Sequence, residues 1–304
     1  MFTPSFTEPN VMKKTSIALL ALALTGGVAS AADLGKKKAP APAPVVVSPW
    51  DFTVGGGLTS NYLFRGISQS NNAASVNANA ELRYTFSNTW AAYVGTAGSS
   101  VKLTDQDQSP NMELDAIGGV RGTFGAFSTD VGAIAYIYPG LKTPTTNNVF
   151  PTNPTFYEGY VKLGYNITDT VSVGANAYYS PSFLDTGANG TYVSATAKWT
   201  LPMDFALSGE FGRQYLGTTN WAHRDQVAQP NTLVALPDYN YWNAGLSYSY
   251  KFVTLDLRYH DTDLSKEKCS MITGTTNGSA SQSKYCGTAV VGTISFALSG
   301  KDIK

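Results

Sequence analysis

Residues 76–86 read Val-Asn-Ala-Asn-Ala-Glu-Leu-Arg-Tyr-Thr-Phe, a strict alternation of apolar and polar side chains. Because successive side chains of a β-strand point to opposite faces, this stretch predicts a strand with one apolar and one polar face. The polar face carries two charged residues, Glu81 and Arg83. We therefore expect this strand to lie between an apolar medium and water.

The same alternation, about eleven residues long, recurs from residue 50 to the end of the chain. Less regular strands are expected at 52–66, 90–101, 127–138 and 205–215. Together these stretches predict about twelve strands. The clear copies lie at 76–86, 113–122, 157–166, 171–179, 193–201, 242–250, 253–260 and 290–296.

The connections between these strands alternate in length. Short turns are expected at 87–89, 125–126, 166–170, 202–204 and 251–252, and long polar loops at 67–74, 102–111, 139–154, 181–190, 216–239 and 264–287. Aromatic residues bracket several of the short turns, as at the interface girdles of membrane barrels. This pattern predicts an all-β protein, a transmembrane antiparallel β-barrel with short periplasmic turns and long external loops.

The N-terminal segment has the features of an export signal. A basic region at 12–14, an apolar run at 17–24 and Ala29-Ser30-Ala31 predict a signal peptide over 1–31, with Met12 as the true start. Residues 32–49, rich in Lys, Ala and Pro, are expected to form a periplasmic tether. The barrel is then expected over 50–298 with a short tail at 299–304, and the location is the cell outer membrane.

The polar faces of the predicted strands carry charges of both signs. Such charges cannot be packed dry without partners, so the interior is expected to be a water channel or a network of ion pairs. Seven acidic and six basic residues share this parity, including Asp130 and Glu210, and this near balance predicts weak ion selectivity. The predicted pore-lining residues are Arg65, Glu81, Arg83, Glu113, Asp115, Arg121, Glu158, Lys162, Lys198, Asp256 and Arg258.

Three short motifs carry a resemblance to a known family. Residues 60–69 read Ser-Asn-Tyr-Leu-Phe-Arg-Gly-Ile-Ser-Gln, and Tyr-Glu-Gly-Tyr at 157–160 and Tyr-Tyr-Ser-Pro at 178–181 follow later. The chain resembles the Gcw-type, or TorF-family, porins over about residues 51–296. The resemblance implies an outer-membrane barrel of proteobacteria.

Arg65, within the first motif, is open to two interpretations. Its guanidinium group could stand in the channel mouth and attract anionic groups. Alternatively it could pair with an interior carboxylate and hold the register of the strands.

The two cysteines, Cys269 and Cys286, fall in one polar segment of an exported chain, which predicts a disulfide within an external loop. No cofactor, metal or nucleic acid is expected, since no motif for any of them is present.

The expected function is passive diffusion of small hydrophilic solutes through a porin-like channel. Outer-membrane lipids and the barrel-assembly machinery are the other expected partners, and the oligomeric state is left open. One alternative is a plugged structural or adhesive barrel that acts through its external loops. Another is an outer-membrane hydrolase, in which His260 with Asp261 and Asp263 would form an acid–base cluster at the rim; the chain is otherwise not expected to be an enzyme.

Overall fold

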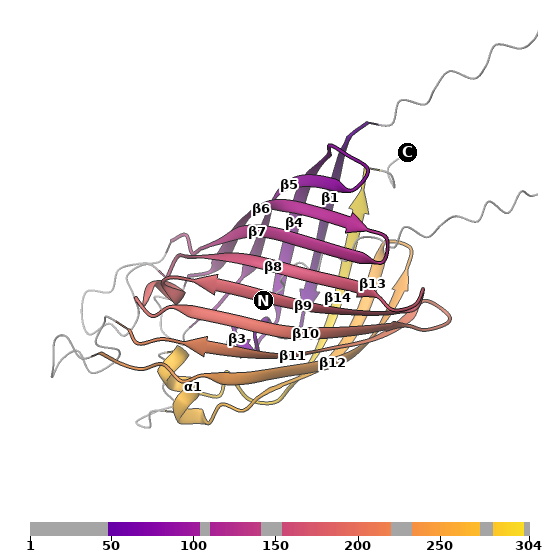
Figure 1. The fold of residues 1–304 in the computed structure, drawn as a ribbon. Helices are drawn as coiled ribbons and strands as arrows, with labels where there is room; N and C mark the ends of the chain where they lie inside the picture. The colour runs from indigo at the N-terminus through magenta and orange to yellow at the C-terminus, as the bar shows by residue number, and fades with distance from the viewer. Residues whose placement is uncertain (1–47, 104–109, 141–153, 220–232, 274–281, 301–304) are drawn as a thin grey trace, which may run out of the picture. The chain divides into compact units, whose positions relative to one another are not determined.

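The computed structural model describes residues 48–103, 110–140, 154–219, 233–273 and 282–300. Twelve strands form one closed antiparallel barrel in which each strand pairs with its neighbours along the chain (Figure 1). The predicted antiparallel barrel of about twelve strands is therefore confirmed. Its strands are β1 (Trp50–Thr59), β4 (Ser75–Thr85), β5 (Trp90–Ser100), β6 (Met112–Phe124), β7 (Phe127–Ile137), β8 (Phe156–Asn166), β9 (Val171–Ser180), β10 (Gly190–Thr200), β11 (Phe205–Leu216), β12 (Tyr239–Tyr250), β13 (Val253–Thr262) and β14 (Ala289–Ser299).

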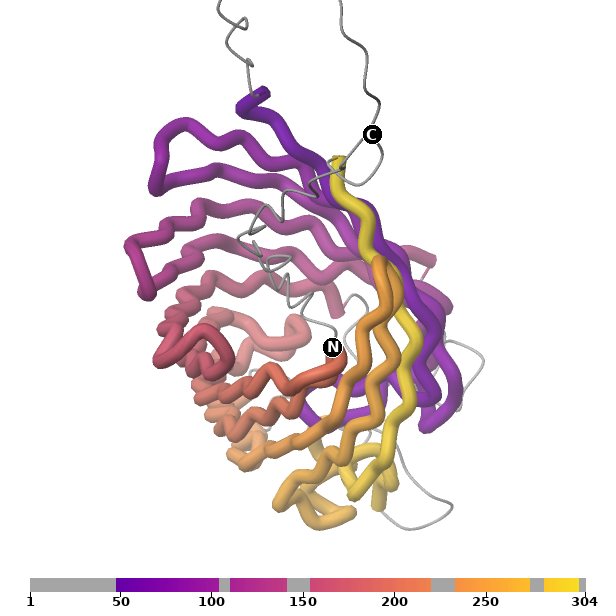
Figure 2. The backbone as a smooth tube through the Cα atoms, turned by 90° about the vertical axis from the view of Figure 1, so that its right-hand side faces the viewer, coloured from indigo at the N-terminus to yellow at the C-terminus, as the bar shows by residue number. Residues whose placement is uncertain are grey.

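The first and last barrel strands close the sheet. Residues of β1 pair with those of β14 from Thr53 opposite Ser299 to Thr59 opposite Thr293. Figure 2 shows the indigo β1 running beside the yellow β14. Because the sheet is closed, no strand of the barrel has an edge with unpaired backbone N–H and C=O groups, which could otherwise pair with another chain.

Apolar side chains cover the outside of the barrel and polar ones the inside. The outward residues Val94, Tyr157 and Leu257 are 62%, 63% and 61% exposed. Their inward neighbours on the same strands are Tyr93, Glu158 and Arg258, which are buried or half-buried. This is the reverse of a water-soluble protein, so the outer wall requires an apolar medium around it.

The connections between barrel strands sort by length to the two ends of the barrel. Short connections at 86–89, 125–126, 167–170, 201–204 and 251–252 lie at one end, here named the turn end. The strand ends that the long connections join lie at the other end, the loop end; in the sequence these connections span 60–74, 101–111, 138–155, 181–189, 217–238 and 263–288. Exposed aromatic residues surround the turn end, in agreement with the expected girdle: Trp50, Phe86, Phe124, Phe127, Trp199, Tyr250 and Phe252.

The first strand is shorter than predicted. Instead of a strand over 52–66, β1 ends at Thr59, and the chain then forms a small hairpin of β2 (Leu63–Phe64) and β3 (Ile67–Ser68). Residues 61–68 are all buried. Arg65 and Gly66 form the turn with positive φ angles of 47° and 82°, the left-handed pair that a two-residue hairpin requires.

Two short helical elements were not predicted. A 3-10 turn, η1 (Phe183–Asp185), follows β9, and an α-helix, α1 (Lys266–Thr273), lies in the last long connection. No helix in the described part of the chain is long and apolar enough to cross a membrane. The predicted signal peptide, almost all of the predicted tether and most of the predicted tail lie outside the described residues.

The two faces of β4 provide a test of this arrangement. Leu82 is exposed on the outer wall, whereas Asn79 points inward. We expect Leu82→Asp to destabilise the membrane-inserted barrel by about 1–2 kcal/mol, because a charge on the lipid face is costly to a degree that depends on depth.

The isosteric Asn79→Asp variant places the same charge on the same strand and is expected to be near neutral. Urea titration of the heat-modifiable gel shift in vesicles measures both. Equal midpoints for the two variants would contradict the assigned faces.

Candidate functional site

The tip of the β2–β3 hairpin places Arg65 in the interior of the barrel. Its guanidinium group donates to both carboxylate oxygens of Glu158 on β8, at 2.9 Å and 2.7 Å. A further N–H group donates to Oε1 of Gln214 on β11 at 2.8 Å. Arg65 and Glu158 are only 6% and 1% exposed. The hairpin is thus tied to two different walls of the barrel.

Aromatic rings surround the same guanidinium group. The rings of Tyr192, Phe64 and Tyr178 lie 4.4, 4.6 and 5.1 Å from its central carbon. Burial alone would lower the pKa of Arg65, but the carboxylate of Glu158 outweighs this and raises it above its ordinary value. Arg65 therefore remains a cation, and a buried bidentate pair of this kind is costly to break.

The base of the hairpin contacts a third strand of the wall, β6. The hydroxyl groups of Tyr62 and Tyr138 donate to the two carboxylate oxygens of Glu113 on β6, the latter at 2.5 Å. Burial, and then the charge of Glu113, raise the pKa of Tyr62, so that its hydroxyl remains a donor. Asp115 is also buried on β6, and its Oδ1 has no hydrogen-bond partner in the described part of the chain.

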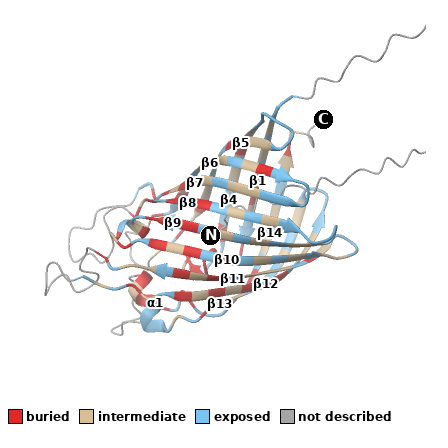
Figure 3. Ribbon diagram, in the orientation of Figure 1, coloured by how far each residue is buried: buried red, intermediate tan, exposed pale blue. Residues whose placement is uncertain are grey.

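Apolar packing completes the filling of the loop end. Phe64 at the hairpin stacks on Phe183 of η1 at 6.2 Å and meets the ring of Tyr136 at 6.0 Å. Tyr136 in turn stacks on Phe156 at 4.5 Å. Figure 3 shows the buried residues gathered toward the loop end, with exposed residues toward the turn end.

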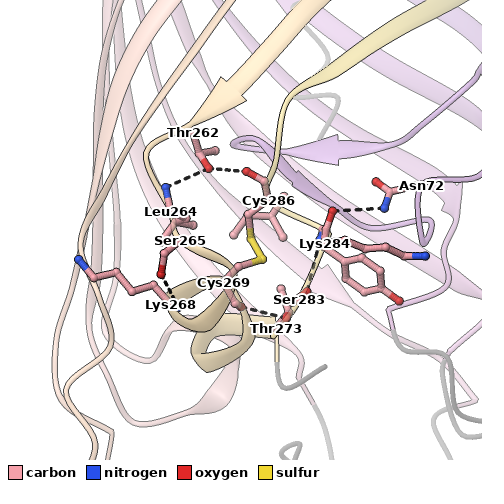
Figure 4. Close-up of a disulfide and its surroundings, with 12 residues drawn as sticks. Asn72, Thr262, Leu264, Ser265, Lys268, Cys269, Thr273, Ser283, Lys284 and Cys286 are labelled. Carbon is pink, nitrogen blue, oxygen red and sulfur yellow. Dashed lines mark hydrogen bonds between the residues drawn. A yellow bond between two sulfur atoms is a disulfide. The ribbon is translucent and has the colours of Figure 1, made fainter. Parts of the chain in front are cut away.

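A disulfide loop lies against the hairpin. Cys269 of α1 and Cys286 are joined by a disulfide with a Cα–Cα distance of 5.8 Å (Figure 4). The backbone N–H of Ser68 donates to the carbonyl of Tyr285 at 2.8 Å. The carbonyl of Cys286 accepts from the hydroxyl of Thr262 on β13 at 2.5 Å. Residues 283–286 therefore connect the bridge, the wall and the hairpin.

Ion pairs line the interior nearer the turn end. Arg121 of β6 donates to both oxygens of Glu81 at 2.7 and 2.9 Å and to Asp130 at 3.0 Å. Two further pairs follow the wall. Arg83 meets Asp51 at 3.2 Å, and Arg258 meets Asp256 at 2.9 Å.

Two interior lysines differ from these arginines. Lys162 on β8 and Lys198 on β10 are half-buried at inward positions. The Nζ atom of Lys162 lies 4.6 Å from the ring of Tyr160. Across the described ranges, neither ammonium group makes an ion pair within 4.0 Å or a hydrogen bond.

The predicted pore-lining residues occupy two levels of the interior. Ten of the eleven stand at inward positions of barrel strands; Arg65 does not, because it lies on the hairpin rather than at the end of strand one. Arg65, Glu113, Asp115 and Glu158 lie toward the loop end, where Arg65 pairs with Glu158. The others stand nearer the turn end: Glu81, Arg83, Arg121, Lys162, Lys198, Asp256 and Arg258.

Several contributors to this interior were missed by sequence reasoning. Tyr62, Gln214 and Asn243 have no charge and were not singled out, although each accompanies a charged residue here. The loss of alternation after Thr59 is the one signal in the sequence that could have shown the hairpin.

His260 has partners other than those of a hydrolytic site. Its Nδ1 atom lies 2.9 Å from the hydroxyl of Tyr241. Asp261 accepts from Tyr259, and Asp263 accepts from Asn240. Within the described residues His260 hydrogen-bonds neither a serine nor a carboxylate, and no cluster of three His, Cys, Asp or Glu residues that could hold a metal ion occurs there.

Several solved structures are similar to this chain at low sequence identity. The NanC porin is 14% identical with a TM-score of 0.44, and the match covers 81% of this chain and 100% of that one. The KdgM porin is 10% identical with a TM-score of 0.41, covering 81% and 98%. The Pseudomonas putida toluene transporter TodX is 11% identical with a TM-score of 0.42, covering 83% and 88%.

In sequence, no curated protein matches the chain. The family model described as "Bacterial protein of unknown function (Gcw_chp)" matches residues 44–286, in agreement with the resemblance to Gcw-type proteins. The match covers most of the chain, which therefore belongs to this family.

Proposed function

We propose that the chain is an outer-membrane channel for small hydrophilic solutes, with the β2–β3 hairpin as its constriction. The observation that carries the proposal is a closed barrel with an apolar outer wall and a charged inner wall. Such a barrel satisfies every strand's backbone groups inside lipid, which an open sheet could not do. Outer-membrane lipids and the barrel-assembly machinery are then its partners.

The interior of the barrel at the turn end is suited to hold water. Inward residues near the short turns are exposed, namely Thr85, Thr123, Ser128 and Ser249. The paired charges above them would be costly to bury without solvent or partners. A barrel of twelve strands has room for a narrow aqueous path, well below that of the large porins.

The hairpin restricts this path at the loop end. Arg65, Tyr62 and Phe64 reach three parts of the wall, on β8, β6 and η1. The contacts combine charge, hydrogen bonding and aromatic packing. We infer that solutes pass only where this filling leaves room, or when the hairpin moves.

The packing of the β2–β3 hairpin inside the barrel also supports a second function. If the hairpin never moves, the barrel is plugged and acts through its external loops as a structural or adhesive protein. The buried Arg65–Glu158 pair, which resists separation, is the observation that supports this alternative.

Single-channel recording distinguishes the two functions. The protein is expressed with its own N-terminal segment, purified from outer membranes and inserted into planar bilayers. Discrete ohmic steps are expected for a channel. Silence from protein shown to be folded by its gel shift would favour the plugged barrel, and recovery from the inner membrane or cytosol would contradict the proposed location.

The Arg65–Glu158 pair makes a specific prediction for conductance. Arg65→Ala leaves the Glu158 carboxylate buried without its cation, a loss of about 3–5 kcal/mol. We expect the hairpin to leave the lumen and the unit conductance to rise.

Replacing both partners, as Arg65→Met with Glu158→Met, removes the charge without leaving one unpaired, so conductance close to wild type is expected. If Arg65→Ala conducts like the wild type, the hairpin is not the constriction.

The disulfide loop makes a second prediction. Cys269→Ser with Cys286→Ser removes the disulfide. A bridge that closes a loop of this length stabilises the folded segment by about 3 kcal/mol, because it restricts the unfolded chain. We expect the residue 282–286 segment to hold the hairpin less firmly, and current noise in the open state to increase. Lys268→Ala, on the exposed face of α1, is the control. Identical noise in both variants would show that the bridge does not restrain the hairpin.

A further inference from the structure

The charges on the inner wall toward the turn end balance in number. The basic residues there are Arg83, Arg121, Lys162, Lys198 and Arg258, and the acidic ones are Asp51, Glu81, Asp130, Glu210 and Asp256. A count of charges therefore predicts little long-range preference for either sign. At short range the inner wall can still bind anions and cations differently, because a permeating ion needs donor or acceptor atoms that are not already engaged with other residues.

Each carboxylate oxygen of the ion-paired acids already accepts a hydrogen bond. Glu81 accepts from Arg121 through both oxygens, at 2.7 and 2.9 Å. Asp130 accepts from Tyr93 through Oδ1 at 2.7 Å and from Arg121 through Oδ2 at 3.0 Å. Asp256 accepts from Arg258 through both oxygens, at 3.1 and 2.9 Å.

The oxygens of the two remaining acids of this region also each accept a hydrogen bond. Asp51 accepts from the backbone N–H of Phe52 at 2.9 Å and from Arg83 at 3.2 Å. Glu210 accepts from the hydroxyl of Tyr192 at 2.9 Å and from Asn243 at 3.4 Å. A cation in this part of the interior therefore meets no carboxylate oxygen that lacks a donor.

The lysines are in the opposite situation. Lys162 stands directly opposite Asp130 in the strand ladder, yet both oxygens of that carboxylate are held by Tyr93 and Arg121. The ring of Tyr160 stabilises the Lys162 ammonium group as a cation without accepting its N–H donors in the way an oxygen does. Lys198 makes no ring contact, ion pair or hydrogen bond within the described ranges.

The wall between the lysines is polar and uncharged. The inward residues of β9 include Ser172, opposite Lys198, and Asn176, opposite Lys162. Asn176 donates to the hydroxyl of Ser194 on β10 at 3.0 Å. No inward position of β9 or β10 carries a carboxylate. The unoccupied donors thus face the lumen from a surface that does not repel anions.

We propose that Lys162 and Lys198 are the anion-coordinating positions of the inner wall, and that the channel prefers small carboxylate-bearing solutes; this rests on the proposed channel function. Among the described residues, Asp115 is the one interior carboxylate with an unpartnered buried oxygen, but it is buried at the loop end beside Glu113. It therefore offers a passing cation little exposed surface. Free ammonium donors on partly exposed side chains are the accessible coordination sites.

Reversal potentials test the proposal. The full-length protein is recorded in a planar bilayer under a roughly tenfold KCl gradient, and succinate is then added to measure block of the chloride current. The wild type is expected to pass chloride in preference to potassium and to be blocked by succinate. In Lys162→Gln with Lys198→Gln the permeability ratio should fall roughly threefold and the block should be lost.

Two further variants separate coordination from general charge. Lys162→Arg with Lys198→Arg keeps both donors and should retain the preference and the block. Lys268→Gln removes one positive charge from the exposed face of α1 and should behave as the wild type.

The outcomes distinguish this proposal from the proposed function. Ohmic steps with a potassium preference, or with the same ratio in wild type and the double Gln variant, would overturn the anion site and leave the channel standing. Absence of steps in folded wild type and in folded Arg65→Ala would overturn both.

Discussion

Closure of the sheet is the constraint on which the rest of the structure depends. In an apolar medium every backbone N–H and C=O group of a strand needs a partner, so β1 must find β14. A run of three glycines in β1 lies at this seam. A Cβ atom at Gly55 would come within 2.8 Å of the Phe296 carbonyl, and one at Gly57 within 2.7 Å of the Ile294 carbonyl. The close approach of these strands therefore requires residues without side chains.

Closure with apolar residues outside forces the polar residues inward, where they must be solvated or paired. The protein uses both solutions at different levels. Toward the turn end, paired charges share the interior with exposed hydroxyl residues such as Thr123 and Ser128. Toward the loop end, the hairpin brings Arg65 to Glu158, and aromatic rings replace water around the pair. The same inward hairpin thus satisfies a buried carboxylate and narrows the lumen.

The strands of the barrel wall could be predicted from the sequence, because apolar and polar side chains must alternate wherever one face of a strand meets lipid and the other does not. The strand over 76–86 was expected within one residue of the observed β4. The same rule failed at 60–68, where both faces of the hairpin are buried against protein and no side chain needs to alternate. Arg65 was therefore assigned to the wrong element, although pairing with an interior carboxylate was one of its two interpretations.

Partners within the interior were beyond sequence reasoning for a different reason. The inward position of Lys162 follows from parity, but its lack of an ion pair depends on Arg121 and Tyr93 reaching Asp130 first. These residues come from four different strands, so no local sequence pattern shows which of them will bind the Asp130 carboxylate. A count of seven acidic and six basic residues treats all charges as equal. Toward the turn end, hydrogen bonding divides the charges into carboxylates whose oxygens each accept a donor and two lysines that make no ion pair or hydrogen bond among the described residues. A lumen with balanced charges can therefore still distinguish anions from cations at contact distance.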